Sequence, residues 1–227
     1  MKKTAIILGA SGLTGGLLIQ KLISDERYET IKLFSRSHIE GLPSKVVQFI
    51  GDLLELETFE SEFTADEVYC CIGTTLKKTP VKSIYKKIDH GIPVRAARLS
   101  KTNGISTFLV ISAMGANKNS SLFYNKTKGE MEQDVLNQKL THTFILRPSF
   151  IEGDRKENRT LEKIGLIIFK IIQPLFFGKL KNYKIVKAES IANTMIHLAN
   201  SNNNAEGIIP SDQINTLGTN NNNNNNK

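Results

Sequence analysis

Two side chains in the stretch LFYNKTKGE (Leu122–Glu130), Tyr124 and Lys128, have the types and spacing of a proton donor beside a charge that tunes it. Positions i and i+4 of a helix share a face, so the phenol and the ammonium would project to the same side. A phenol that titrates near ~10 needs roughly 4 kcal/mol of stabilisation to ionise at neutral pH. An ammonium ~5 Å away contributes about 3 kcal/mol at an effective dielectric constant of ~20. The pair therefore suits acid–base chemistry, although the same spacing also fits a solvated helix face.

A glycine-rich loop near the start of the chain predicts a phosphate-binding turn. The segment GASGLTG follows the apolar run Lys3–Leu8, a predicted buried strand, and opens the predicted helix Gly15–Ser24. Gly9 allows a tight turn, Gly12 lets the backbone approach a pyrophosphate, and Gly15 lets helix and strand pack closely. The helix N-terminus adds free N–H groups and a positive dipole end. In this strand–turn–helix context the pattern predicts dinucleotide binding.

The end of the second predicted strand indicates which dinucleotide binds. An acidic residue there would hold the ribose 2′-hydroxyl of NAD, but Leu33–His38 contains none. Arg36 is placed instead to pair with a 2′-phosphate, and Ser35 and Ser37 can add hydrogen bonds. We therefore expect NADP(H) as the preferred cofactor, with NAD(H) as the alternative.

Short apolar runs alternate with helical stretches along the chain, which predicts an α/β fold with a doubly wound, mostly parallel sheet and helices on both faces. One domain spans residues 1–218, and about 149–218 form a small substrate-side extension. Residues 219–227 are an asparagine-rich tail that we expect to be disordered, because it has nothing to bury. The predicted strands are Lys3–Leu8, Thr30–Ser35, Lys45–Ile50, Glu67–Ile72, Thr107–Ser112, Thr143–Leu146 and Gly207–Pro210, and the main predicted helices are Gly15–Ser24, Val94–Thr102, Tyr124–Gln138 and Glu189–Asn200.

The composition narrows the classes of protein and partner. The 227 residues are 40% hydrophobic, enough for one large core. The adjacent Cys70 and Cys71 have neither metal-binding nor redox spacing, so we predict no metal site and a cytoplasmic protein with reduced cysteines. The net charge of +8 lacks a dense Lys/Arg tract, which argues against nucleic acid. The apolar stretch Ile164–Phe177 is broken by Lys170 and Pro174 and is too short to span a membrane, so no membrane partner is expected.

Taken together, these features resemble the short-chain dehydrogenase/reductase family. A Tyr-x3-Lys helix follows a predicted strand that ends in serine, at VISAMGA with Ser112, and the resemblance runs from Gly9 to about Pro210. It is closest to the atypical members that are similar to the Tat-interacting oxidoreductase-like proteins. The segments that carry it are GASGLTG, CCIGTT (Cys70–Thr75), SLFYNKTKGEME (Ser121–Glu132), ILRPSFI (Ile145–Ile151) and GDRKENR (Gly153–Arg159).

The resemblance implies a role for each matching residue. Tyr124 would exchange the proton at the substrate oxygen, Lys128 would lower the pKa of that phenol and hold the nicotinamide ribose, and Ser112 would donate to the substrate oxygen. Asp52 and Arg159 also suit a helix cap and a salt bridge. The implied cofactor-binding residues are Gly9, Ser11, Gly12, Leu13, Thr14 and Gly15 around the pyrophosphate, Arg36 and Ser37 at the 2′-phosphate, Asp52 at the adenine amino group, Ile72 and Gly73 along the adenosine, Ile151 near the nicotinamide, Arg159 from beyond the sheet, and Tyr124 with Lys128.

The sequence therefore predicts an NADP-dependent oxidoreductase that acts on a small carbonyl or alcohol substrate. The alternative is an NADP(H)-binding sensor or regulatory protein that changes its affinity for a protein partner without turnover. Many members of the family place an asparagine for a proton relay on the preceding helix, where KIDHGIPVRAA offers Asp89 and His90. This departure fits the sensor, whereas the intact Ser112, Tyr124 and Lys128 favour the enzyme.

Overall fold

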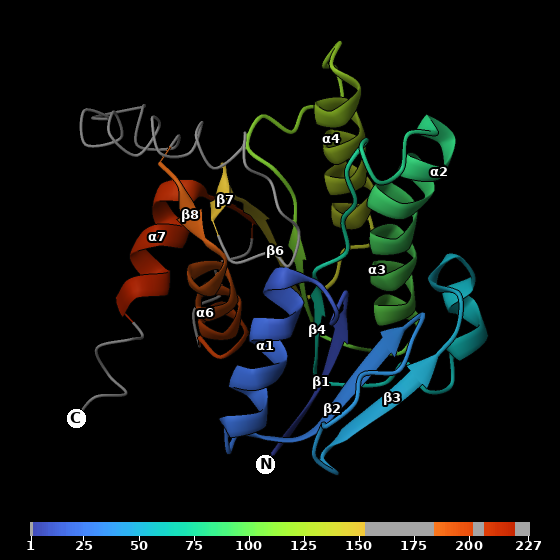
Figure 1. Ribbon diagram of the computed structural model, residues 1–227, viewed down its shortest axis with the longest axis vertical. Helices are drawn as coiled ribbons and strands as arrows, with labels where there is room; N and C mark the ends of the chain where they lie inside the picture. The colour runs from blue at the N-terminus through green and yellow to red at the C-terminus, as the bar shows by residue number, and fades with distance from the viewer. Residues whose placement is uncertain (1, 153–183, 202–206, 221–227) are drawn as a thin grey trace.

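The computed structural model describes residues 2–152, 184–201 and 207–220. Its main sheet has seven strands in the order β3-β2-β1-β4-β5-β6-β9, and every neighbouring pair is parallel (Figure 1). The predicted doubly wound sheet is thus confirmed, because this order reverses direction between β1 and β4. The strands are β1 (Lys3–Leu8), β2 (Tyr28–Ser35), β3 (Val46–Ile50), β4 (Glu67–Cys70), β5 (Thr107–Ile111), β6 (His142–Arg147) and β9 (Gly207–Pro210).

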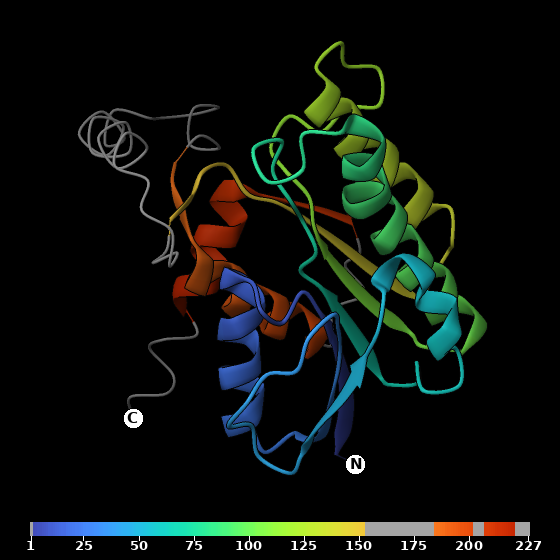
Figure 2. The same ribbon diagram turned by 45° about the vertical axis from the view of Figure 1, so that its right-hand side comes forward.

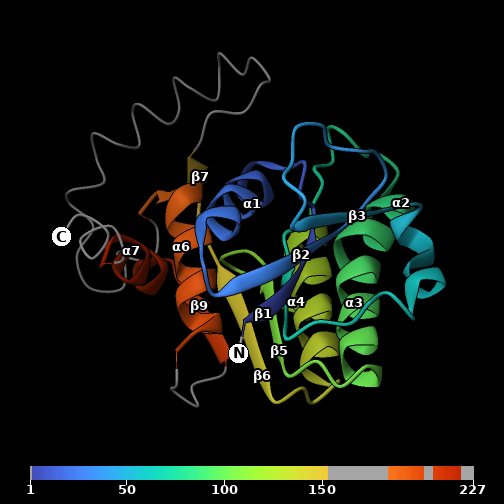
Figure 3. The ribbon, with the colours of Figure 1, turned by 90° about the horizontal axis from the view of Figure 1, so that it is seen from below.

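Helices cover both faces of the sheet. Helices α1 and α6 pack against each other on one face, and α3 and α4 pack on the opposite face (Figure 3). A short parallel pair, β7 (Ile151–Glu152) and β8 (Val186–Lys187), lies apart from the main sheet. The helices are α1 (Leu13–Ser24), a 3-10 helix (Leu53–Phe59), α2 (Lys82–Lys86), a π-helix (Lys87–Gly91), α3 (Ile92–Thr102), α4 (Phe123–Leu136), α6 (Ala188–Ala199) and α7 (Ser211–Asn220).

The central strands bury side chains on both faces, which explains their continuous apolar runs. Ile7 and Leu33 belong to the core beneath α1 and α6, whereas the neighbouring Ile6 and Phe34 belong to the core beneath α3 and α4. Alternate residues of each strand therefore build two separate cores. The sheet edge that carries the strand ends is held between these two layers (Figure 2).

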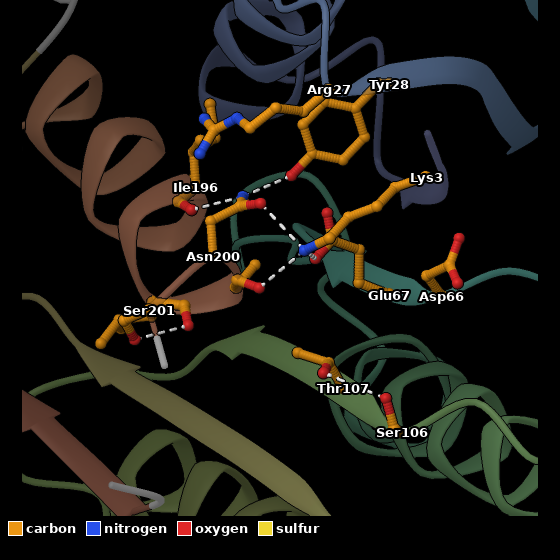
Figure 4. A network of polar contacts seen from close by, with 12 residues as sticks. Lys3, Arg27, Tyr28, Asp66, Glu67, Ser106, Thr107, Ile196, Asn200 and Ser201 are labelled. Carbon is orange, nitrogen blue, oxygen red and sulfur yellow. Dashed lines mark hydrogen bonds and ion pairs between the residues drawn. The ribbon is translucent and has the colours of Figure 1, made fainter. Parts of the chain in front are cut away.

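A buried polar network closes the opposite end of the sheet, where the strands begin (Figure 4). The Tyr28 and Tyr69 hydroxyls lie 3.0 Å apart, and Tyr69 donates to the buried Glu67 at 3.0 Å. Lys3 contacts Glu67 at 3.4 Å and donates to the Asn200 side chain at 2.9 Å. Asn200 in turn donates to the Tyr28 hydroxyl at 2.6 Å. The network joins β1, β2 and β4 to the end of α6.

Two sequence-based expectations change at the C-terminal end. Helix α7 reaches Asn220, so residues 219 and 220 are helical rather than part of a disordered tail. Residues 221–227, Arg159 and the apolar stretch Ile164–Phe177 lie outside the described residues. Within the described ranges, no helix is both long and apolar enough to cross a membrane.

Candidate dinucleotide and catalytic site

The glycine loop leaves room only for backbone at the point where the strand order reverses. Gly9 has a φ of +83°, and a Cβ there would lie 2.7 Å from the Cys71 carbonyl oxygen, just beyond β4. A Cβ on Gly15 would lie 2.2 Å from the Gly9 oxygen, and one on Gly12 3.2 Å from the same atom. The Gly12 N–H donates to the Gly9 oxygen at 3.0 Å, which closes the turn. These approaches are the ones that the glycine spacing requires.

The start of α1 provides an anion-binding helix end. Gly12 is the N-cap residue, and no described side chain caps this end of α1. The N–H groups of the first turn have no partner within the helix, and the helix dipole favours negative charge there. Ser11 and Gly12 are exposed, Leu13 is half-buried and Thr14 is buried. The loop and the helix end therefore fit the pyrophosphate of a dinucleotide.

Arg36 and Ser37 lie exposed directly after β2. The Ser35 hydroxyl donates to the Ser37 carbonyl at 2.8 Å, and the Gly51 N–H donates to the Ser35 carbonyl at 3.0 Å, so the turn beneath Arg36 is braced. The neighbouring Asp52 caps the 3-10 helix, because its carboxylate accepts the Leu54 N–H at 2.9 Å. The cap interpretation of Asp52 is thus confirmed, and its contact with an adenine stays a prediction.

Two further cofactor-site predictions fall on residues near this edge. The Cys71 N–H donates to the Leu8 carbonyl at 2.9 Å, so the segment after β4 stays beside β1. In that segment Ile72 is half-buried and Gly73 is exposed. Ile151 lies half-buried in β7 and pairs with Val186 of β8. Contacts of these side chains with a cofactor stay predictions.

Tyr124 and Lys128 occupy successive turns of α4 with very different exposure. Tyr124 lies in the first turn and is 41% exposed, whereas Lys128 is 4% exposed. Helix α4 follows the parallel strand β5, so its first turn lies at the strand ends, where the glycine loop also lies (Figures 1 and 2). The expected shared face therefore places an accessible phenol above a buried ammonium.

Asp89 is the ion-pair partner of Lys128, and the sequence did not assign it this role. The Lys128 Nζ lies 3.1 Å from Asp89 Oδ1, and both side chains are buried. Asp89 also accepts the Thr74 N–H at 2.7 Å and the Tyr85 hydroxyl at 3.3 Å. It stands in the π-helix between α2 and α3, a type of distortion frequent at functional sites. Its carboxylate therefore joins the segment after β4, α2 and α4.

The pKa values in this cluster differ from the sequence-based expectation. Burial has the largest effect on the pKa of Tyr124 and raises it; Lys128 acts to lower the pKa and Asp89 to raise it, and the result lies above the ordinary value. Burial acts to lower the pKa of Lys128, but Asp89 and Tyr124 outweigh burial and raise it. The prediction that Lys128 brings Tyr124 close to neutrality is wrong for this structure, because Asp89 balances the lysine charge.

The predicted role of Ser112 also needs correction. Its hydroxyl donates to Glu132 Oε1 at 2.5 Å, and Ser112 is buried. Glu132 is eight residues beyond Tyr124 on α4, about 12 Å along the helix axis at 1.5 Å per residue. A hydroxyl has one proton to donate, so this bond leaves none for a substrate oxygen. The structure therefore assigns Ser112 to α4 rather than to the substrate.

The described residues contain no group of three or more His, Cys, Asp or Glu side chains that could hold a metal ion. The functional residues that sequence analysis missed are Asp89, with its anchors Thr74 and Tyr85. A partial signal existed, since Asp89 stands where relatives carry an asparagine. Its partner Lys128 lies on another helix, however, and no local pattern links the two.

A family model described as NAD(P)H-binding matches residues 9–202. The chain belongs to this NAD(P)H-binding family. It is 34% identical over 163 residues to the protein FMP52, mitochondrial, of Candida glabrata, covering 69% of this chain and 67% of that protein. The Debaryomyces hansenii protein of the same name is 30% identical over 206 residues, covering 86% and 87%. The Rattus norvegicus protein HTATIP2 is 31% identical over 171 residues, covering 74% and 70%.

Solved structures share the fold of this NAD(P)H-binding protein. The Bordetella bronchiseptica enzyme WbmH in complex with NAD+ superimposes with a TM-score of 0.70 at 12% identity, covering 92% of this chain and 75% of that one. The UDP-N-acetylglucosamine 4-epimerase from Methanobrevibacter ruminantium gives 0.68 at 17% identity, covering 96% and 81%. With the family match, this likeness makes the chain an atypical short-chain dehydrogenase/reductase with a Rossmann fold that binds a pyridine nucleotide.

The comparisons correct the predicted localisation. The sequence analysis expected a cytoplasmic protein from its two unpaired cysteines. Similar FMP52 proteins from three yeasts carry the word mitochondrial in their names. The cytoplasmic prediction is therefore wrong, because reduced cysteines do not distinguish one reducing compartment from another.

Proposed function

We propose that this protein is an NADP-dependent oxidoreductase that transfers a hydride to or from a small carbonyl or alcohol substrate. The observation that carries the proposal is the accessible Tyr124 phenol, one helical turn from the buried Lys128 ammonium, at the sheet edge that holds the glycine loop. A binding module has no need of a proton donor in that position. Oxidoreduction of a carbonyl needs one, since a proton must move at the oxygen when a hydride moves at the carbon.

Each part of the site has a distinct task in this proposal. The first turn of α1 would hold the pyrophosphate, and Arg36 would pair with the 2′-phosphate of NADP(H). The dinucleotide, when bound, supplies the hydride chemistry. Tyr124 would exchange the proton at the substrate oxygen, and Lys128 would orient the nicotinamide ribose. The protein thus contributes binding, orientation and one proton.

The test separates chemistry from binding in the full chain. Small aldehydes, ketones and quinones are screened by NADPH absorbance, and NADPH affinity is measured by calorimetry. We expect Tyr124→Phe to lose turnover and keep NADPH affinity, because the ring remains and only the hydroxyl goes. Tyr28→Phe is the matched control, since it removes a hydroxyl from the far end of the sheet (Figure 4). Wild-type turnover in Tyr124→Phe would reject the catalytic assignment.

One observation favours the alternative, an NADP(H)-binding sensor without turnover. The Ser112 hydroxyl is committed to Glu132, so the described residues offer no serine at the strand end to hold a substrate oxygen. The same screen distinguishes the two functions. Failure of every substrate, together with a change in affinity for a protein partner on NADPH addition, would favour the sensor.

A further inference from the structure

The Asp89 carboxylate has the contacts of a fixed charge rather than of an incidental neighbour. It is 1% exposed and receives the Lys128 ammonium, the Thr74 N–H and the Tyr85 hydroxyl. A Cβ on Gly73 would lie 3.7 Å from Asp89 Oδ1, so the backbone after β4 also packs against it. With three donors from three segments, the carboxylate has little freedom to move away from Lys128.

We propose that Asp89 is a positioning residue that balances the Lys128 charge, so that Tyr124 works as a phenol and the site delivers a proton to a carbonyl oxygen. This inference rests on the proposed oxidoreductase function and adds the working direction, which is reduction. A lysine that acts alone on a neighbouring tyrosine would stabilise the phenolate, the form that accepts a proton. A lysine paired at 3.1 Å presents almost no net charge to the same tyrosine.

The other titratable groups around the pair leave this balance in place. Tyr85 in α2 donates to Asp89, and Cys70 at the end of β4 is fully buried. His90, next to Asp89, is bound to Asp134 of α4 at 2.8 Å and so has its own anion. Burial raises the pKa of Tyr124, and Asp89 adds to this effect while Lys128 opposes it. Among the described groups, Asp89 is therefore the one whose removal should most favour the phenolate.

The proposed step balances with a reduced nicotinamide dinucleotide as the reductant. The carbonyl carbon gains a hydride, the C=O double bond becomes a single bond, and its oxygen gains the Tyr124 proton. The tyrosine is left as a phenolate and recovers its proton from water. A group that begins as a phenol at neutral pH is in the correct form for this direction, whereas oxidation requires the phenolate first.

The test measures ionisation of Tyr124 directly and needs neither substrate nor cofactor. Phenolate absorbance is followed against pH in the wild type and in Tyr124→Phe, and the difference isolates Tyr124. We expect the wild-type Tyr124 signal to appear only above about pH 10, the ordinary range of a free tyrosine. Asp89→Asn should bring the signal down by about one pH unit or more, the usual size of a single-charge effect at close range.

The matched control is Asp134→Asn, which removes a carboxylate bound to His90 elsewhere on α4 and should leave the Tyr124 signal unchanged. A Tyr124 signal near neutral pH in the wild type would overturn the inference, and this measurement stands even if Asp89→Asn does not fold. An unshifted or higher signal in a folded Asp89→Asn would also overturn it. Absence of turnover on every substrate would instead count against the proposed function, so the two failures are distinguishable.

Discussion

The Ser112 hydroxyl donates to Glu132 Oε1 at 2.5 Å, across the gap between the end of β5 and the middle of α4. The same carboxylate accepts the Arg147 Nε at 2.8 Å, so the end of β6 joins the contact. Because Glu132, Lys128 and Tyr124 are spaced four residues apart on one helix, this contact fixes the height of α4 above the strand ends. Ser112 therefore acts on the candidate site through helix position.

Replacement of Ser112 by alanine should cost stability more than chemistry. We expect the free energy of unfolding to fall by about 1.5–3 kcal/mol, since a buried hydrogen bond to a charged group is lost. Turnover should fall less than about tenfold, whereas loss of a group that stabilises the reacting oxygen typically costs a hundredfold or more. Denaturant unfolding and NADPH-linked turnover measure the two effects. Ser100→Ala, which removes a buried hydroxyl within α3, is the control, and a hundredfold loss confined to Ser112→Ala would restore its catalytic role.

The exposed Arg36 should set the choice of cofactor. NADPH is expected to bind at least tenfold tighter than NADH, because a phosphate–arginine pair contributes about 1.5–3 kcal/mol. Arg36→Ala should remove most of this preference and leave NADH affinity unchanged. Calorimetric titration of both nucleotides measures it, with Arg98→Ala, on α3 beside Glu57, as the control. Equal affinities in the wild type would contradict the prediction.

Gly129, next to Lys128, should tolerate no side chain. A Cβ there would lie 2.2 Å from the Lys118 nitrogen and 2.3 Å from the Asn117 carbonyl carbon, both backbone atoms. Gly129→Ala should therefore lower the melting temperature, although alanine favours a helix by about 1 kcal/mol. Gly16→Ala is the matched control within α1, because its Cβ would meet nothing closer than 3.7 Å, and we expect it to be neutral or stabilising. Thermal unfolding should separate the two variants, and equal melting temperatures would show that the loop moves freely.

Glu67 should make stability depend on pH. Burial raises the pKa of Glu67 above its ordinary value, so the folded state binds the proton more tightly than the unfolded state does. Its contribution is then fully present below the unfolded pKa and is lost as pH rises through the folded one, by up to about 1.4 kcal/mol per pH unit. Denaturant unfolding at several pH values should show this decline in the wild type and not in Glu67→Gln. The exposed Glu60→Gln should follow the wild type, and a parallel curve for Glu67→Gln would refute the assignment.

Local pattern was sufficient for the glycine loop and most of the sheet. The residues from Gly9 to Gly15 act within one strand–turn–helix unit, so their spacing alone predicts the close approaches that the structure contains. Strands buried on both faces are likewise visible as apolar runs, and β1 and β9 begin and end where the sequence predicted. Helix α7 was missed because its sequence, SDQINTLGTN, is mostly polar. It packs against α6, where a Cβ on Gly218 would lie 2.5 Å from the Ser190 oxygen, and this contact is invisible in local sequence.

Tertiary structure alone decided the partners of the catalytic candidates. The sequence put Tyr124 and Lys128 on one helical face, and the exposures of 41% and 4% agree with an accessible phenol above a buried amine. It did not reveal that Asp89 neutralises Lys128 or that Glu132 occupies Ser112. Periodicity reports which residues share a face within one element. The charge around a buried group depends on which other elements pack over it, and that is settled only when the whole sheet and its helices come together.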